Sequence, residues 1–289
     1  MNRSKTDILL LLSAMIWGFA FVAQRAGMQF IGPFTYNAIR FALGGFFLIP
    51  FVKKKSSSNL LNKTNIKSGI ILGLVLFAGS SLQQFGIVYT TAGNAGFITG
   101  LYVILVPIIG LIFGRKTNMG TWLGAILAVA GMYLLSSSND ININYGNLLV
   151  FISAFFWAIH VLLIDQFTKR SDPLIIAFIQ FLVTSLLCSI GMFTFEEPQF
   201  SGIFKAIIPL IYGGLISVGI GFTLQIIAQR KAHPTHAAII LSLEAVFAVM
   251  GGILILHESL NSNTLLGCLL MLSGIILSQL WLKKKKLVS

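Results

Sequence analysis

Two ionisable side chains, Glu244 and Arg40, stand inside long apolar stretches of the chain. Glu244 follows Thr235 by nine residues and Arg40 follows Pro33 by seven, so helices that begin there carry them about 13 Å and about 10 Å inward. Both depths fall near the middle of a hydrocarbon core about 30 Å thick, where ionisable groups are costly and mark functional sites. We predict that Glu244 binds a proton or an amine and that Arg40 binds a carboxylate. The alternative is structural: the two form an ion pair, or each bonds to the backbone of a neighbouring helix.

Neutral polar and aromatic side chains occur in the same apolar stretches. Such groups either line a cavity for a polar substrate or hold helices together by hydrogen bonds and packing. Beside Glu244 and Arg40, we predict a substrate-binding cavity lined by Gln84, Gln225, Trp17, His160, Asn37, Tyr102 and Asn94.

The histidines do not form an arrangement suited to catalysis or metal binding. His160 and Asp165 are five residues apart, and that spacing separates them by about 140° around a helix. His233 and His236 have the spacing of a helical metal pair, but no Cys, Asp or Glu follows nearby, so a loop and cap role is expected. No phosphate-binding glycine loop or nucleophile motif occurs either. We therefore expect no catalytic residue, no metal, no cofactor and no ATP-driven pump in this chain.

The composition places these residues in a membrane. Of 289 residues, 56% are hydrophobic and 10% are charged, against about 25% charged in soluble domains. The net charge of +12 would suit nucleic-acid binding, but the basic residues stand in short gaps between apolar stretches and form no basic face. That distribution is typical of cytoplasmic loops beside an anionic leaflet.

Ten apolar stretches have the length of about 17–25 residues that spans a bilayer as a helix. They cover residues 8–27, 33–52, 69–90, 94–114, 119–136, 146–168, 173–193, 203–229, 235–256 and 264–282. The sequence therefore predicts an all-α membrane protein with ten transmembrane helices.

The basic residues orient these helices. Lys and Arg gather in cytoplasmic loops, and placing the N-terminus inside puts most of the 20 basic residues on that side. The inner residues are then Arg3, Lys5, Lys53, Lys54, Lys55, Lys63, Lys67, Arg115, Lys116, Lys169, Arg170, Arg230, Lys231 and the run 283–286. Both termini lie inside only if the number of helices is even, which agrees with ten.

The second half of the sequence repeats the first at offsets of 140 to 143 residues. The matching pairs are Ser13 with Ser153, Ala14 with Ala154, Trp17 with Trp157, Pro33 with Pro173, Arg40 with Gln180, Gln84 with Gln225, Gly124 with Gly267 and Gly131 with Gly274. Each half holds five helices, an odd number, so the second half inserts upside down. Inverted repeats of this kind place the substrate site of secondary transporters near the midplane.

Four stretches resemble the drug/metabolite transporter superfamily, in particular its EamA-type ten-helix members, and the resemblance covers nearly the whole chain. They are Ser13-Ala14-Met15-Ile16-Trp17-Gly18, Tyr89-Thr90-Thr91-Ala92-Gly93-Asn94-Ala95-Gly96-Phe97, Leu243-Glu244-Ala245-Val246-Phe247-Ala248 and His257-Glu258-Ser259-Leu260. The sequence departs from the family at Ala245, where a proline often follows the glutamate. The resemblance implies a pair of EamA repeats, alternating access, and transport of amino acids or related metabolites, often outward.

These observations predict a first EamA repeat over residues 1–136, a connecting loop over 137–145 and a second repeat over 146–289. The expected function is secondary transport of amino acids or related zwitterions across the inner (plasma) membrane, in the export direction. A multidrug, nucleoside or sugar-related transporter stays open as the alternative, and an intramembrane lipid-modifying enzyme is the least favoured one. The expected partners are a small-molecule substrate, the lipid bilayer and a coupling proton or exchanged solute. No nucleic acid is expected, and a homodimer is one of the assembly states left open.

Overall fold

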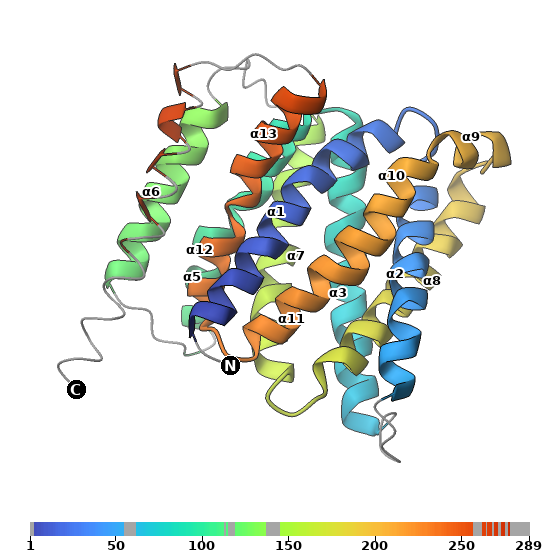
Figure 1. The fold of residues 1–289 in the computed structure, drawn as a ribbon, viewed down its shortest axis with the longest axis horizontal. Helices are drawn as coiled ribbons and strands as arrows, with labels where there is room; N and C mark the ends of the chain where they lie inside the picture. Colours follow the sequence, from blue (N-terminus) through green and yellow to red (C-terminus); the bar gives the residue numbers. More distant parts are fainter. Residues whose placement is uncertain are drawn as a thin grey trace.

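The computed structural model describes residues 3–54, 62–112, 114, 119–136, 145–256 and short pieces between 262 and 277. Every regular element in these residues is a helix (Figure 1). In chain order they are α1 (Arg3–Gly27), α2 (Pro33–Lys54), α3 (Lys63–Val88), α4 (Ala92–Gly100), α5 (Tyr102–Ile112), α6 (Met119–Ser136), α7 (Tyr145–Phe167), α8 (Pro173–Phe195), α9 (Phe200–Lys205), α10 (Ile207–Ile211), the π-helix η1 (Tyr212–Phe222), α11 (Thr223–Gln229), α12 (Pro234–Leu241) and α13 (Glu244–Leu256).

Eight helical stretches are long and apolar enough to cross a membrane, which confirms the predicted class of all-α membrane protein. They are Ser4–Gly27, Pro33–Lys54, Lys63–Val88, Ala92–Ile112, Tyr145–Phe167, Pro173–Phe195, Ile207–Gln229 and Pro234–Ile255. The predicted span 119–136 corresponds to α6, whose apolar part Trp122–Gly131 is shorter. Most of the predicted span 264–282 and of the predicted connection 137–145 lies outside the described residues, so the count of ten stays a prediction.

Most helices begin where the sequence places a proline or a capping side chain. Pro173 and Pro234 stand in the first turns of α8 and α12, where the missing N–H costs nothing. The predicted start of the third span, residue 69, is wrong: α3 begins at Lys63, because the side chain of Asn62 accepts a hydrogen bond of 2.8 Å from the backbone N–H of Asn65. The helix therefore extends past the apolar stretch that predicted it.

The predicted helix 203–229 is also not a single helix. Residues Phe200–Lys205 form the separate short helix α9, and the long segment begins at Ile207. Its middle, Tyr212–Phe222, is a π-helix rich in glycine. A π-helix is rare and concentrates at functional sites, because its wider turns change which backbone groups are free to bond.

Two predicted spans are interrupted near their midpoints. Residues 94–114 divide into α4 and α5 at Leu101, and residues 235–256 divide into α12 and α13 at Ser242 and Leu243. The second interruption occurs although no proline follows Glu244. The hydroxyl of Ser242 instead bonds to the carbonyl of Ile239 at 2.8 Å, a local bond that competes with the helical ladder.

Helices of the first half pack mainly against helices of the second half. Helix α2 contacts α8 and η1, α3 contacts α7 and α8, and α1 contacts α13 and η1. The contacts follow the sequence repeat. The contact of α1 with α13 has its counterpart in that of α7 with α5, and the contact of α2 with η1 has its counterpart in that of α8 with α3. In Figure 1 the N-terminus and the α7–α8 turn lie at the lower end, whereas α9 lies at the upper end.

Candidate substrate-binding cavity

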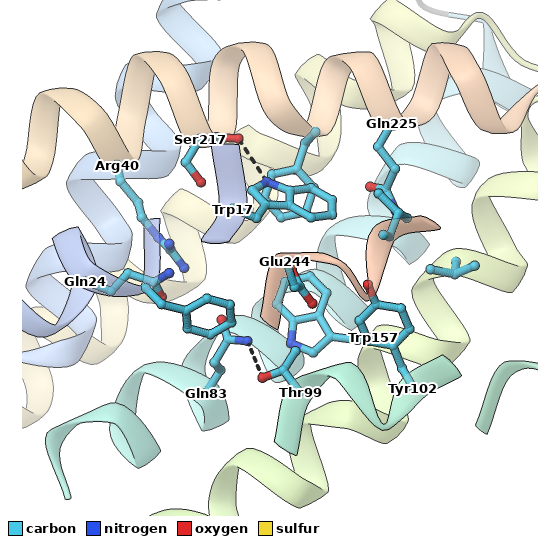
Figure 2. Close-up of a pocket in the computed structure, with 14 residues that line it drawn as sticks. Trp17, Gln24, Arg40, Gln83, Thr99, Tyr102, Trp157, Ser217, Gln225 and Glu244 are labelled. Atoms are coloured by element: carbon cyan, nitrogen blue, oxygen red, sulfur yellow. Dashed lines mark hydrogen bonds between the residues drawn. The ribbon is translucent and has the colours of Figure 1, made fainter. Parts of the chain in front are cut away.

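A small cavity of about 40 Å³ lies between the two halves, where the interrupted helices pass each other (Figure 2). Ten of the helical elements supply its lining. The lining residues are Trp17, Phe21, Gln24, Arg40, Gln83, Thr99, Tyr102, Trp157, Val161, Ser217, Phe222, Gln225, Leu241 and Glu244. The cavity is therefore an apolar chamber with a few polar groups, which is the usual composition of a small-molecule site.

Glu244 enters the cavity as the first residue of α13. It is 4% exposed, and its Oε1 has no hydrogen-bond partner. Tyr102, the first residue of α5, faces the same space, and its hydroxyl lies beside the Glu244 carboxylate. The two residues are 142 apart, within the offsets of the sequence repeat, so each interrupted helix places one polar side chain at its break.

Arg40 reaches the cavity from α2 and is 2% exposed. The centre of its guanidinium lies 5.5 Å from the ring of Tyr36 and 4.9 Å from the ring of Phe41, contacts that stabilise a cation through the ring quadrupole. Its Nε has no hydrogen-bond partner. The aromatic rings therefore hold the guanidinium in place without neutralising its charge.

No ion pair joins Arg40 to Glu244 in the part of the chain that the structure describes. The predicted alternative of a structural ion pair between them is therefore wrong for this conformation. Figure 2 shows both side chains in one chamber. A buried charge without a partner is unstable by several kcal/mol in an apolar medium, so each of the two groups is a candidate for contact with a ligand.

Amides and a hydroxyl complete the polar part of the wall. Gln83 donates a hydrogen bond of 3.0 Å from Nε2 to Oγ1 of Thr99, which fixes α3 against α4. The Oε1 atoms of Gln24 and Gln225 are buried and unpartnered. These two acceptors suit the N–H or O–H groups of a polar ligand.

Aromatic rings form the apolar part of the wall. The ring of Phe222 lies 4.6 Å from Trp17 and 5.9 Å from Trp157, measured between centroids. Nε1 of Trp17 donates to the carbonyl of Ser217 in the π-helix at 3.3 Å, whereas Nε1 of Trp157 is buried without a partner. The two tryptophans that correspond in the sequence repeat thus meet across Phe222.

Five of the nine predicted site residues line the cavity together: Glu244, Arg40, Gln225, Trp17 and Tyr102. The other four, Gln84, His160, Asn37 and Asn94, are not among its lining residues. His160 Nε2 lies 3.0 Å from Oε1 of Gln180, and Nδ2 of Asn37 donates to the carbonyl of Ser80 at 3.2 Å. These two therefore join helices to one another. Gln84 is buried with both amide atoms unpartnered, and Asn94 lies in the first turn of α4, where its backbone N–H donates to Thr91.

Sequence reasoning missed several lining residues, including Gln24, Gln83, Thr99 and Ser217. Gln83 and Gln84 are neighbours and differ by about 100° around the helix, so a small error in helical phase exchanges them. The sequence repeat favoured Gln84 because it matches Gln225, but the structure turns Gln83 into the cavity.

Comparison with known proteins agrees with this architecture. The model of the EamA-like transporter family matches residues 4–137 and 144–280. An uncharacterized transporter of Archaeoglobus fulgidus is 31% identical over 96% of this chain and 87% of its own length. The uncharacterized transporter YoaV of Bacillus subtilis is 25% identical over 94% of this chain and 96% of its own length. A chain of known crystal structure has the same fold, with a TM-score of 0.82 at 17% identity, covering 98% of this chain and 99% of that one. The chain is thus a multi-pass membrane transporter and belongs to the EamA-like transporter family.

Proposed function

We propose that this transporter carries amino acids or closely related zwitterions outward across the inner membrane by alternating access. One observation carries the proposal: Arg40 and Glu244 line a single buried cavity and form no ion pair with each other or with another described side chain. A zwitterion supplies a carboxylate for Arg40 and an ammonium for Glu244, and it neutralises both charges in one binding event.

The walls of the cavity fit this ligand class, because a mainly apolar lining carries a few polar groups that can orient a ligand. The unpartnered amide oxygens of Gln24 and Gln225 accept further donors of a polar solute. The rings of Trp17, Trp157 and Phe222 contact its apolar part. An uncharged or purely anionic solute offers no positive charge to the Glu244 carboxylate, so we expect such solutes to bind less tightly.

The interrupted helices support alternating access. In secondary transporters with inverted repeats, discontinuous helices meet at the substrate site, and one repeat moves against the other. Here the breaks at Leu101 and at Ser242 occur in corresponding helices of the two halves. The proposed repeats are residues 1–136 and 146–289. The outward direction rests on the family resemblance alone.

Glu244 is also the proposed coupling group. It is an ionisable side chain in the middle of a membrane span, and its Oε1 is free to exchange a proton or an ammonium. If a proton and the substrate compete for Glu244, one leaves as the other binds. Replacing Glu244 by Gln keeps the shape of the side chain and removes this exchange, so it should abolish proton-coupled transport in vesicles.

The test begins with metabolite profiling of cells with and without the protein, followed by counterflow in proteoliposomes. Each amino acid identified is compared with two analogues, one without the carboxylate and one without the amine. We expect Arg40→Gln to lose the preference for the amino acid over the analogue without a carboxylate. Glu244→Gln should lose the preference over the analogue without an amine.

Two exposed charges provide matched controls, because Glu197→Gln and Arg230→Gln make the same changes outside the cavity. Both controls should keep both preferences. The proposal fails if no polar metabolite changes in the profiles, or if Arg40→Gln and Glu244→Gln lower transport of all three compounds equally. The second result would assign the two residues to stability and not to recognition.

A further inference from the structure

A second hollow lies far from the substrate cavity, at the end of the bundle where α3 begins and α7 ends. It has a volume of about 470 Å³ and is lined by Lys63, Thr64, Lys67, Ser68, Gln166, Phe167, Lys169 and Arg170. We call it the basic groove. Because Lys63 opens one membrane span and Phe167 closes another, the groove lies at the level of the lipid headgroups.

The groove has an excess of positive charge. Four of its lining side chains are cationic and none is acidic. Of the two carboxylates near the groove, Asp165 is engaged by Lys169 at 3.0 Å, and Asp172 caps the start of α8. Lys63, Lys67 and Arg170 take part in no ion pair within the described part of the chain. The dipoles of the α3 N-terminus and the α7 C-terminus oppose each other here, so the cationic side chains are what favours an anion.

Hydrogen bonds make the floor of the groove rigid. The hydroxyl of Ser171 donates to that of Ser68 at 3.0 Å, and the backbone N–H of Asp172 donates to Oδ1 of Asn65 at 3.1 Å. These bonds hold the α7–α8 turn against the first turns of α3. The cations on the two elements are therefore kept at a fixed separation, unlike lysines on a free loop.

An aliphatic track, formed by Ile70 and Leu74, continues from the groove into the membrane. Lys63, Lys67, Ile70 and Leu74 lie within about 60° of one another around α3, at 100° per residue. Ile70 and Leu74 are 41% and 50% exposed, which in a membrane span means exposed to lipid. The surface thus presents cations at the headgroup level and an aliphatic track directly beneath them.

We propose that the basic groove binds the phosphodiester headgroup of an anionic phospholipid, with an acyl chain lying along Ile70 and Leu74. Basic pockets at the membrane surface recognise anionic lipids through charge, and the lysine stems add apolar contact. A free phosphate ion satisfies the cations but leaves the aliphatic track unused, so the lipid is the better ligand. The site is independent of the transported substrate.

The test compares two pairs of lysines in the full-length protein. Purified protein in detergent is titrated with phosphatidylglycerol or phosphatidylcholine, and bound lipid is counted by native mass spectrometry. We expect the wild type to retain phosphatidylglycerol preferentially. Lys63→Gln with Lys67→Gln should weaken this binding by about tenfold or more, given the contribution of each lysine near an anionic headgroup. Arg170→Gln should weaken it independently.

The matched control is Lys53→Gln with Lys54→Gln, which removes the same charge from the end of α2, outside the groove. It should change binding by less than about twofold, because these two exposed lysines do not line the groove. An equal loss in both pairs would assign the effect to net charge and overturn the proposal. Equal retention of both lipids would also overturn it, as would displacement of the lipid by millimolar inorganic phosphate.

Discussion

Asp7 of α1 and His236 of α12 hold Oδ1 and Nε2 2.9 Å apart, at the end of the bundle that carries the N-terminus. At an offset of 140 residues, Asp7 corresponds to Asn147. Oδ1 of Asn147 accepts a hydrogen bond of 2.7 Å from Thr90, at the opposite end of the bundle. Each contact joins the first turns of α1 or α7 to the beginning of an interrupted helix.

The two contacts predict opposite effects on access to the cavity. Asp7→Ala removes the contact at the N-terminal end, so conformations open at that end should become more populated. A lost contact of about 1 kcal/mol corresponds to a change of about fivefold. Gln225→Cys, in a background without Cys188 and Cys268, should react about fivefold faster with an impermeant maleimide added from that end. Asn147→Ala should slow the same reaction, and equal acceleration by both substitutions would contradict the prediction.

At Gly18, helix α1 packs so closely on α13 that there is no room for a side chain. A Cβ there would overlap Cβ of Phe247 and lie 2.7 Å from the carbonyl oxygen of Glu244. Overpacking of this kind usually costs about 1–3 kcal/mol, so Gly18→Ala should lower the thermal unfolding temperature in detergent. Gly45→Ala is the control, because its nearest neighbour is the flexible end of Leu182 at 3.3 Å. Similar temperatures for the two variants would refute close packing of α1 on α13.

Glu196, the residue directly after α8, bonds to the first turn of α2, and we expect this contact to stabilise the protein. Its carboxylate accepts hydrogen bonds from the backbone N–H groups of Phe34 and Thr35, both at 2.8 Å, and from the Thr35 hydroxyl at 2.6 Å. Such a bond at a helix start contributes about 1–2 kcal/mol. Glu196→Ala should therefore reduce the free energy of unfolding by that amount. The neighbouring exposed residue serves as control, and Glu197→Ala should have little effect. Equal free energies of unfolding for the two variants would show that the Glu196 contact does not stabilise the protein.

The sequence predicted the helices well where a local signal marks them. Pro33, Pro173 and Pro234 each stand in the first turn of a helix, because proline suits that turn and disrupts later ones. The interruption at Ser242 has no such signal. It depends on a hydroxyl bonding to its own helix and on packing against α1, and neither is visible in a local pattern.

The candidate site was partly predictable for a similar reason. Glu244 and Arg40 are recognisable because an ionisable residue inside an apolar stretch is costly wherever it points. Neutral residues lack this signal, and which of Gln83 and Gln84 faces the cavity depends on helical phase. Gln24 and Ser217 could be predicted only by knowing that α1 packs on η1. That packing brings together Trp17 and Ser217, which are 200 positions apart in the sequence.

The two tryptophans of the cavity should respond differently to the loss of their Nε1 groups. Nε1 of Trp17 donates to Ser217, so Trp17→Phe removes an existing hydrogen bond of about 1 kcal/mol and should mainly lower stability. Nε1 of Trp157 is buried and unpartnered in the wall of the same cavity, so its donor is available to a bound substrate. Trp157→Phe should therefore raise KM by about fivefold and leave the unfolding temperature nearly unchanged. Counterflow and thermal unfolding on both variants measure the two effects separately. If Trp157→Phe lowered stability as much as Trp17→Phe and left KM unchanged, Trp157 would be a packing residue with no contact to the substrate.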